Sequence, residues 1–573
     1  MAKSLAQMRY HILTTDYDGT IAENEKVSQA TLEALLRLKA TGRYLILVTG
    51  RELGPLQAIF PEYTIFDLIV AENGALIYNP ANLQKILLGE RPTDSFIQAL
   101  KEKGIPLSVG EVIVATWEPH QDAVLEAIKV AGLEHQVIFN KGAIMILPPG
   151  VNKATGLHRA LKELNLSEHN AVAVGDAEND NAMLQVVECA VAVGNALPQL
   201  KANADWVAPG ERGEGVSELI SQIILDDLAI LDPKLSRYYL EIGKQADGAS
   251  YEISPYGNNI LLAGTSGCGK TTLAAAFIGK LIEKKYQFCL IDPEGDYQDL
   301  AGAITIGDSS QPPLIDHVIK VLSQPAENAI VCFLAIPLSH RPVYFKKLRC
   351  ALTELRKNTG HPHFIIIDEA HHLMPKENTV NFNDFPEDFT NIFAITTQPD
   401  LLCPDFLKRI NVVLAMGESP AQTIVSFAVA SGNEIILPDT GKFQKRDVLV
   451  WRKEPGSISV IKSSEPGQFL MRHKRKYASG DMYSNSFYFT GPSHKLNLKA
   501  NNLMIFIQMA AGIDDETWLY HLHRHDYSKW FRNSVKDPKL SLRSEAIEND
   551  EPNAALSRKE IFSLILNRYT LPA

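Results

Sequence analysis

The chain has 573 residues, of which 45% are hydrophobic and 21% charged, and its formal net charge is −11. This length exceeds what one hydrophobic core supports and predicts roughly two to four domains. The acidic balance argues against a surface built mainly to grip the phosphate backbone of a nucleic acid, although a local basic face remains possible.

Cysteine usage and hydropathy indicate where the protein resides. The 6 cysteines show no C-x-x-C pairing and are expected to be reduced thiols. The N-terminus lacks an apolar signal segment, and no apolar run approaches the roughly 20 residues that a membrane span requires. We therefore expect a cytoplasmic protein that makes no contact with a membrane.

An acidic motif closes the first apolar run. Asp16 and Asp18 follow the run at 11–13 and share one face, because strand side chains alternate with period two. Gly19 then permits a turn. Converging carboxylates repel each other unless a cation lies between them, and Mg²⁺ prefers such oxygen ligands. One carboxylate could then attack phosphorus, although two solvated acids on a surface turn are the alternative.

Further motifs follow in order along the first 220 residues. Thr49-Gly50-Arg51 ends a second apolar run, at 44–48, and Lys153 precedes an expected helix. Gly175-Asp176-Ala177-Glu178-Asn179-Asp180 ends a third run, at 171–174. Together with Asp16-Tyr17-Asp18-Gly19-Thr20, these motifs resemble those of the haloacid dehalogenase (HAD) superfamily of phosphatases.

This resemblance implies roles for individual residues. Asp16 would be the nucleophile and Asp18 the general acid/base, with Lys153 also in the catalytic set. The implied Mg²⁺ ligands are Asp16, Asp18 through its carbonyl, Asp176 and Asp180. The implied contacts to the substrate phosphate are Thr49, Gly50, Lys153 and Asn179. Arg51 is left open between a substrate contact and a structural salt bridge.

The first module, predicted over 1–225, alternates strands and helices. Residues 28–39 predict a helix with Ser28 as its N-cap, and the alternation favours a parallel α/β sheet with ligands at the carboxyl ends of its strands. An α/β cap is predicted at about 76–150. Together with the segment Ala71-Glu72-Asn73-Gly74-Ala75, this cap resembles the sugar-phosphatase and archaeal phosphoglycolate-phosphatase branch. The cap is expected to cover the active site, and the alternative is an inserted domain that has no part in substrate choice. The polar stretch 226–250 is predicted to be a linker.

A P-loop predicts a second phosphate site, in a P-loop NTPase α/β domain over 251–470. An apolar strand at 260–263 leads into the loop, and an apolar helix follows it. The loop's N–H groups and the helix dipole would hold phosphates, Lys270 would reach the outer phosphates, and Thr271 would bind Mg²⁺. The predicted ATP contacts are Gly264, Thr265, Ser266, Gly267, Cys268, Gly269, Lys270, Thr271 and Thr272.

Three later segments complete the expected nucleotide site. The run 364–367 would deliver Asp368 to the metal and Glu369 to the attacking water, and Gln398 would sense the terminal phosphate. With the segment 290–297, these motifs resemble the HerA/FtsK/VirB4 group of ATPases. That resemblance implies a homo-oligomer, up to a hexamer, with Arg409 as the candidate to act on a neighbouring subunit; a surface arginine is the alternative.

The C-terminal region, 471–573, is predicted to be mainly helical. The basic run 472–477 could bind nucleic acid, but a solvated linker is the alternative. The cluster His521, His523, His525 and Asp526 could hold a metal, but we favour a structural role because this spacing spreads around a helix. Residues 545–553 are expected to be loose, and 557–566 to form the last helix.

Three functions agree with these patterns. The first is a bifunctional enzyme, a Mg²⁺-dependent phosphatase for small phosphorylated metabolites of the sugar phosphate or phosphoglycolate class fused to an ATPase. The second is an ATP-driven translocase or remodelling protein for DNA or protein, with the HAD part accessory. The third is a phosphatase gated by a nucleotide-sensing domain. We rank the first ahead of the third, and the third ahead of the second.

Overall fold

A computed structural model describes residues 8–140, 142–298, 300–376, 389–438, 443–444, 446–463, 482, 486–492, 496, 498–535, 537–550 and 553–569. One compact unit contains both α/β domains, and a second contains the C-terminal region. The predicted basic run 472–477 lies outside the described residues. Among the helices of the described part, none combines the length and apolarity that crossing a membrane demands.

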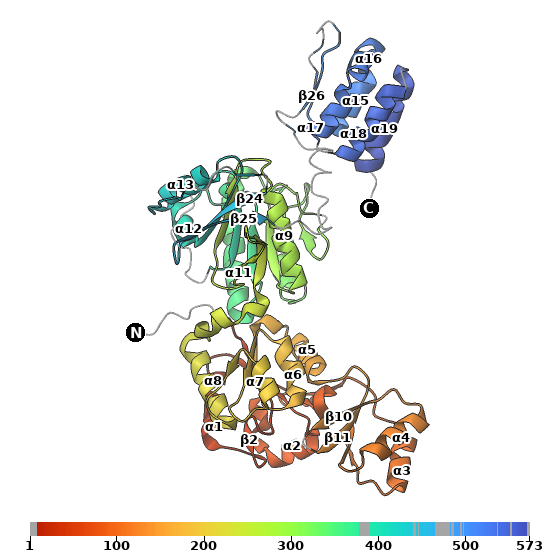
Figure 1. Ribbon diagram of the computed structural model, residues 1–573, viewed down its shortest axis with the longest axis vertical. Helices are drawn as coiled ribbons and strands as arrows, with labels where there is room; N and C mark the ends of the chain where they lie inside the picture. Colours follow the sequence, from red (N-terminus) through yellow and green to blue (C-terminus); the bar gives the residue numbers. More distant parts are fainter. Residues whose placement is uncertain are drawn as a thin grey trace. The chain divides into compact units, whose positions relative to one another are not determined.

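The N-terminal domain is built on a sheet whose central strands are parallel (Figure 1). Across the sheet the strands are β14 (Trp206–Val207), β13 (Cys189–Ala192), β12 (Ala171–Gly175), β1 (Ile12–Thr15), β4 (Tyr44–Val48), β5 (Leu68–Ala71), β6 (Leu76–Asn79) and β7 (Gln84–Leu87). The helices are α1 (Gln29–Lys39), α2 (Leu53–Ile59), α5 (Lys153–Glu163), α6 (Asn181–Val186), α7 (Pro198–Asn203) and α8 (Arg212–Asp226). The helix expected at 28–39 is confirmed, and the Ser28 side chain accepts a hydrogen bond from Thr31 N.

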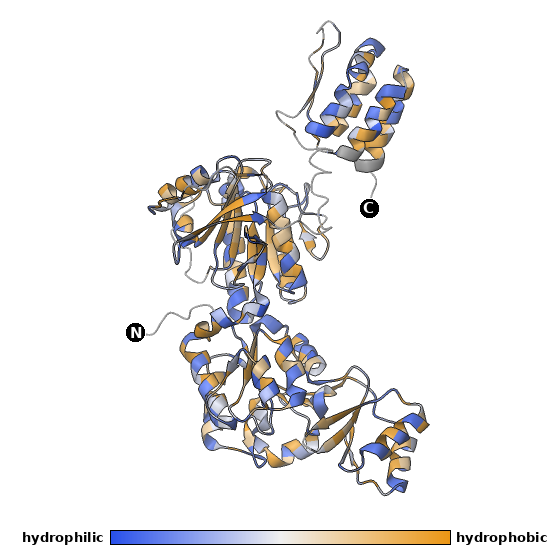
Figure 2. Cartoon of the chain, viewed as in Figure 1, coloured by the Kyte–Doolittle hydropathy of each residue, from blue (hydrophilic) through white to orange (hydrophobic). Residues whose placement is uncertain are grey.

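Hydrophobicity explains this layering. The central strands of both large sheets are hydrophobic, while many helices show one polar and one apolar side (Figure 2). Strands β1, β4 and β12 are buried at nearly every position. Such continuous burial is typical of parallel strands that are covered on both faces. The carboxyl ends of β1, β4 and β12 therefore meet at one edge, where loops carry the predicted motifs.

The cap is a separate antiparallel sheet with its own helices. Its strands, in order across the sheet, are β10 (Gln136–Asn140), β11 (Ala143–Leu147), β9 (Val114–Trp117) and β8 (Ser108–Val109), and its helices are α3 (Asp94–Glu102) and α4 (Gln121–Ala131). The predicted start near residue 76 needs correction, because β6 and β7 pair with the core sheet rather than with the cap. The left-handed turn at Glu72, Asn73 and Gly74 reverses the chain and adds these strands antiparallel.

The second domain has a larger mixed sheet. In order, its strands are β16 (Ser250–Ile253), β15 (Leu240–Lys244), β25 (Ser457–Ser463), β24 (Asp447–Arg452), β23 (Val412–Met416), β17 (Ile260–Gly264), β22 (Ile392–Thr396), β21 (Phe364–Ile367), β18 (Phe288–Asp292), β20 (Ala329–Cys332) and β19 (Ile304–Ile306). The helices are α9 (Lys270–Glu283), α10 (Ile315–Leu322), α11 (Arg341–Thr359), α12 (Pro404–Arg409) and α13 (Pro420–Ser431).

The stretch 226–250, predicted as a linker, is structured over much of its length. Strand β15 lies inside it and pairs with β16 and β25, because Leu240 and Ile242 alternate toward the core. The acidic start of this stretch, which suggested a linker, contacts the first domain. Asp227 accepts hydrogen bonds from Arg9 N and the Arg43 guanidinium, and this contact fixes the start of the segment.

Buried polar side chains join the two α/β domains. Glu188, with no exposed surface, accepts hydrogen bonds from Arg9 Nη2 at 2.9 Å, His169 Nδ1 at 2.6 Å and the Tyr286 hydroxyl at 2.9 Å. The other ring nitrogen of His169 lies 2.7 Å from the Lys284 carbonyl, and its ring stacks on Tyr286. Burial alone would raise the pKa of Glu188, but the His169 and Arg9 contacts bring it below its ordinary value. We call Arg9, His169, Glu188, Lys284 and Tyr286 the domain seam.

The C-terminal region is mainly helical, as predicted. It contains a β26 (Phe487–Phe489) and β27 (Leu498–Ala500) pair and the helices α15 (Leu503–Gly512), α16 (Asp515–His523), α17 (Asp526–Asn533), α18 (Pro538–Asp550) and α19 (Ala554–Tyr569). The expectation that 545–553 is loose is wrong up to Asp550, because α18 packs on α17 and Glu548 accepts a hydrogen bond from Ser528 N.

Candidate functional site

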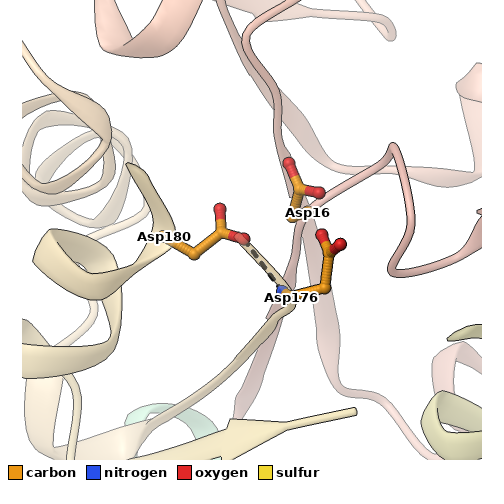
Figure 3. A group of neighbouring side chains, drawn as sticks. All are labelled: Asp16, Asp176 and Asp180. Atoms are coloured by element: carbon orange, nitrogen blue, oxygen red, sulfur yellow. Dashed lines mark hydrogen bonds between the residues drawn. The ribbon is translucent and has the colours of Figure 1, made fainter. Parts of the chain in front are cut away.

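The three carboxylates predicted to hold a metal converge at the edge of the first sheet. Asp16 follows β1, Asp176 follows β12, and Asp180 lies in the turn after Asp176 (Figure 3). One oxygen of each lies within 4.8 Å of the others, and all three side chains are buried. This proximity follows from register, because β1 and β12 pair in parallel.

Lys153 supplies the charge that balances these acids. Its Nζ lies 2.6 Å from Asp16 Oδ1 and 2.5 Å from Asp180 Oδ1, and the side chain is 1% exposed. Burial and the neighbouring Asp180 raise the pKa of Asp16 to about 7, against the lowering effect of Lys153. Burial would lower the pKa of Lys153, but Asp16 and Asp180 raise it above its ordinary value. A lysine is kept charged in the interior by its two partners.

The oxygens of Asp180 have further partners. Its Oδ2 accepts hydrogen bonds from Asp176 N and Ala177 N, both at 2.9 Å, while Oδ1 faces Lys153. Thr20 adds a hydroxyl that lies 3.2 Å from both Asp16 Oδ2 and Asp176 Oδ1. Thr20 belongs to the first motif but was not assigned a role from the sequence. Asp180 and Thr20 thus fix the relative positions of the other two acids.

Asp18 lies apart from this cluster and pairs with Arg51. The guanidinium makes a bidentate salt bridge, with Nε 2.6 Å from Oδ2 and Nη2 2.7 Å from Oδ1. Arg51 also contacts Glu25 at 3.0 Å. The sequence left two hypotheses open for Arg51, a substrate contact and a structural salt bridge, and the structure contains the salt bridge. This salt bridge orients the Asp18 carboxylate near the end of β4.

The predicted phosphate contacts lie under the cap. Thr49 is fully buried after β4, and its hydroxyl oxygen accepts a hydrogen bond from Arg51 N at 3.1 Å. A side chain at Gly50 would meet Met145 of β11 and Asn179, at 3.6 and 4.0 Å from its first carbon. Asn179 donates to the Asn73 side chain at 3.1 Å. Sequence reasoning assigned no role to Met145 or Asn73, although Asn73 belongs to the segment 71–75 that carries the resemblance to the phosphatase branch.

A buried glutamate ties the cap to this edge of the core. Glu72, 1% exposed and with φ of 53°, accepts hydrogen bonds from the backbone N–H groups of Glu111, Val112 and Ile113 at 2.9, 2.8 and 2.9 Å. It directly precedes Asn73, which contacts Asn179. The position of the cap is therefore linked through adjacent residues to the proposed phosphate site.

A cavity of about 590 Å³ lies beside the cap joint rather than over the acids. It is lined by the start of α2, by Tyr78, Lys85 and Arg91, and by the cap loop at 109–111, with Glu72 among its walls. Asp16, Lys153 and Asp176 do not line it. The acidic cluster is thus closed off from solvent in this structure, and its side chains are at most 5% exposed.

The second predicted centre forms where β17 passes into α9. The P-loop connects these elements, and α9 begins at Lys270, whose Nζ donates to the carbonyls of Gly264 and Thr265 at 2.8 and 3.0 Å. A side chain at Gly264 would lie 2.3 Å from the Met416 carbonyl on the adjacent strand β23, which explains the glycine. The remaining P-loop residues, 265–269, occupy the strand-to-helix turn that the sequence predicted.

The other nucleotide-site candidates follow neighbouring strands. Asp368, 1% exposed, and Glu369 follow β21, and Gln398 follows β22, which lies between β17 and β21. His371 Nδ1 lies 3.1 Å from the Thr396 hydroxyl and 3.5 Å from Glu369 Oε2. Burial, His372 and Lys270 lower the pKa of His371 to about 4, so this ring is neutral near pH 7.

The predicted structural role of the tail histidines agrees with the contacts of His521. Its Nδ1 lies 2.9 Å from Asp526 Oδ2, and its Nε2 accepts a hydrogen bond from Thr490 N at 3.0 Å. His525 Nδ1 lies 3.2 Å from Glu548. Within the described part of the chain, the acidic cluster of Asp16, Asp176 and Asp180 is the one group whose ligand atoms converge as a metal requires.

Comparison with known proteins identifies the first domain. The profile of the haloacid dehalogenase-like hydrolase family matches residues 13–120 and 112–220. Phosphoglycolate phosphatase 2 of Saccharolobus solfataricus is 32% identical over 229 residues, which cover 37% of this chain and 92% of that protein. The chain belongs to the haloacid dehalogenase-like hydrolase family.

Other relatives have similar coverage. The phosphoglycolate phosphatase of Methanothermobacter thermautotrophicus is 28% identical over 37% of this chain and 98% of its own length. A haloacid dehalogenase-like hydrolase structure from Bacteroides thetaiotaomicron is 19% identical, covers 37% of this chain and 99% of that one, and has a TM-score of 0.34. The profile of an AAA domain matches residues 255–419. The chain thus joins a HAD phosphatase domain to a P-loop NTPase domain of the AAA type.

Proposed function

We propose that the HAD domain is a Mg²⁺-dependent phosphatase for small phosphate esters and that the AAA domain hydrolyses ATP. The observation that supports the first activity is the position of Lys153 Nζ, 2.6 Å from Asp16 and 2.5 Å from Asp180. A cation beside a buried nucleophile stabilises the negative charge that accumulates during phosphoryl transfer.

The reaction has two steps. An oxygen of Asp16 bonds to phosphorus while the ester P–O bond breaks. Asp18, which must first leave its salt bridge with Arg51, passes a proton to the departing alcohol oxygen. Water then attacks phosphorus and passes a proton to Asp18, the Asp16–phosphorus bond breaks, and inorganic phosphate leaves. Thr49, Gly50 and Lys153 hold the phosphate oxygens during both steps, and Asn179 orients the site.

The donor set fits a magnesium ion. Carboxylate and carbonyl oxygens are the ligands that Mg²⁺ prefers, and Asp16, the Asp18 carbonyl and Asp176 would supply them. Bound there, the ion would offset charge on the phosphate. Asp180 is the weaker ligand, because its oxygens already accept bonds from Lys153, Asp176 N and Ala177 N. We assign Asp180 chiefly to positioning its neighbours.

In the AAA domain the P-loop backbone would bind the ATP phosphates. Thr271 and Asp368 would hold a second Mg²⁺, Glu369 would orient the attacking water, and Gln398 would contact the terminal phosphate. Lys270 would exchange its bonds to the loop carbonyls for bonds to phosphate oxygens. The order of β17, β22 and β21 in the sheet supports this assignment, because it aligns the three strand ends that carry these groups.

Substitution of the nucleophile tests the proposal. Asp16→Asn should abolish release of phosphate from esters while leaving ATP hydrolysis at the wild-type rate. Removal of Mg²⁺ with a chelator should stop both activities, and added Mg²⁺ should restore them. Ester hydrolysis by the Asp16→Asn protein at the wild-type rate would refute the assignment of Asp16.

The domain seam favours a second candidate, a phosphatase gated by nucleotide. His169 lies in the turn just before β12, Glu188 directly precedes β13, and Asp176 directly follows β12. Tyr286 lies just before β18 in the AAA sheet. A shift of either sheet would therefore act on buried hydrogen bonds of the other. Such coupling must be reciprocal in binding free energy.

The gating candidate predicts a specific binding result. A slowly hydrolysed ATP analogue should change the affinity of Asp16→Asn protein for a phosphate ester, and Tyr286→Phe should weaken that change. Equal affinities with and without the analogue would exclude gating. The translocase alternative, with a ring of subunits and Arg409 acting between them, stays a prediction, and stimulation of ATP hydrolysis by DNA would favour it.

A further inference from the structure

The cavity of about 590 Å³ beside the cap joint has no part in the proposed reaction, because neither the acidic cluster nor Lys153 lines it. Its volume lies within the range of small-molecule sites. One wall belongs to the core, where Glu52 precedes α2 and Tyr78 lies on β6. The other wall belongs to the cap, through the loop at 109–111. A molecule held in this cavity would therefore touch both the core and the cap.

The charges around the cavity leave carboxylates in excess. Lys85 Nζ, in one wall, lies 2.6 Å from Glu111 Oε1. Arg91 Nη2 lies 3.2 Å from Asp94 Oδ1, so both cationic side chains of the lining already have an acid. Glu52, by contrast, caps no helix with its side chain and enters no ion pair with the residues that the structure describes. The core wall thus presents a carboxylate whose charge no neighbour balances.

Glu72 adds a second such carboxylate at the joint itself. Its Oε1 accepts one backbone N–H, from Glu111, while its Oε2 accepts two, from Val112 and Ile113. A carboxylate offers about four acceptor positions, so one remains for a further donor. Glu72 is 1% exposed and forms no ion pair within the described ranges, and a buried charge without a counter-charge is costly. A cation in the cavity would supply both the donor and the charge.

The remaining lining indicates what the body of the ligand is. Leu53, Pro55, Leu83 and Val109 contribute apolar side chains, against which an alkyl chain would pack. Tyr78 contributes an aromatic ring, and such rings attract ammonium groups. Apolar walls that carry unbalanced carboxylates are complementary to an alkylammonium ion.

We propose that this cavity binds a small organic cation, an alkyl chain that carries primary ammonium groups, and that the bound cation holds the cap against the core. One ammonium group pairs with Glu52 on the core wall, and another donates to the remaining acceptor position of Glu72. The three N–H bonds to Glu72 stay in place, so the ligand adds a link between core and cap. This inference goes beyond the proposed phosphatase reaction, because binding here needs neither Asp16 nor turnover.

Three six-carbon chains that differ only in their end groups test the class of ligand. The probes are 1,6-diaminohexane, 1,6-hexanediol and adipate, which end in ammonium, hydroxyl and carboxylate groups. Calorimetry with full-length protein should show that the diamine binds roughly tenfold or more tightly than the other two. Exchange of the amide hydrogens of Val112 and Ile113 should slow several-fold when the diamine is bound. Equal binding of the three probes, tightest binding of adipate, or no binding of the diamine would overturn the inference.

A matched pair of variants locates the site. Glu52→Gln should weaken binding of the diamine roughly tenfold or more, because a charge-assisted hydrogen bond is lost. Glu62→Gln makes the same change in net charge at an exposed side chain of the same domain that does not line the cavity, so it should leave the affinity unchanged. Equal effects of the two substitutions would assign the binding to diffuse attraction by an acidic protein and would overturn the inference. None of these readouts requires ester hydrolysis, so failure of the phosphatase proposal would be seen separately.

Discussion

Glu72 is expected to hold the cap closed, and Glu72→Gln tests this. In the native structure one carboxylate accepts backbone N–H groups from Glu111, Val112 and Ile113. Hydrogen bonds to a charged acceptor contribute about 1.5–3 kcal/mol each. Glutamine keeps an oxygen for two of the three donors, loses the charge and turns an NH₂ group toward the third.

The expected cost to cap closure is about 2–4 kcal/mol, which corresponds to a roughly 30- to 900-fold shift toward the open cap. Hydrogen exchange measures this shift directly at the amides of Val112 and Ile113, which should exchange faster by a similar factor. The kcat/KM for a phosphate ester should fall as well, since Glu72 directly precedes the Asn73 that contacts Asn179.

Two variants control this experiment. Glu111→Gln alters a half-exposed side chain that pairs with Lys85 at the surface, so it should leave exchange unchanged. Gly110→Ala would place a carbon 2.7–2.8 Å from the Glu72 carboxylate and should mimic Glu72→Gln. If amide exchange at 112 and 113 in folded Glu72→Gln protein equals that of the wild type, Glu72 does not hold the cap.

Three other variants test separate parts of the account. Gly156→Ala would place a carbon 2.5 Å from Val70 Cγ1, and denaturant titrations should show a free energy of unfolding lower by about 1–3 kcal/mol. Gly54→Ala is the control, because nothing lies within 4 Å of its added carbon, and it should not lower the free energy of unfolding. Equal effects of the two substitutions would contradict the packing argument. Lys270→Ala should abolish ATP hydrolysis and spare ester hydrolysis, and loss of both would mean that the sites are not separable. Glu188→Gln removes the buried carboxylate that Arg9, His169 and Tyr286 share, although Arg9 keeps its ion pair with Asp232, and it should lower the free energy of unfolding by about 3–5 kcal/mol. Glu168→Gln, nearer the surface, should cost little, and a cost for Glu188→Gln no greater than that of this control would exclude the seam as a source of stability.

The sequence predicted those features that depend on short contiguous patterns. Asp16, Lys153 and Asp176 could be assigned to one site because each follows or precedes a regular element whose position in a parallel sheet is constrained. The P-loop could be recognised for the same reason, because its pattern is confined to the short contiguous segment 264–272. Strand alternation also anticipated that the first and second modules are α/β domains, and both were confirmed by the sheets and by the family profiles.

Features that depend on distant contacts were not predictable in this way. The predicted cap boundary was wrong because the sequence does not show that β6 pairs with β5 of the core sheet and that β7 pairs with β6. The supposed linker contains β15, whose partner β25 lies more than two hundred residues away in sequence. Met145 contacts the Gly50 loop and Glu72 contacts the loop at 111–113 only because the cap folds back onto the core. A single methionine or glutamate gives no sequence pattern that marks such a distant contact.

The central claim is that Asp16 receives the phosphoryl group, and chemical trapping tests it most directly. Protein mixed with a phosphate ester and Mg²⁺ is quenched during turnover and reduced with borohydride, which converts an aspartyl phosphate into homoserine. Peptide mass spectrometry should find homoserine at Asp16, dependent on substrate and absent from Lys153→Met protein. Turnover accompanied by modification at another carboxylate, or by no modification at Asp16, would contradict the account.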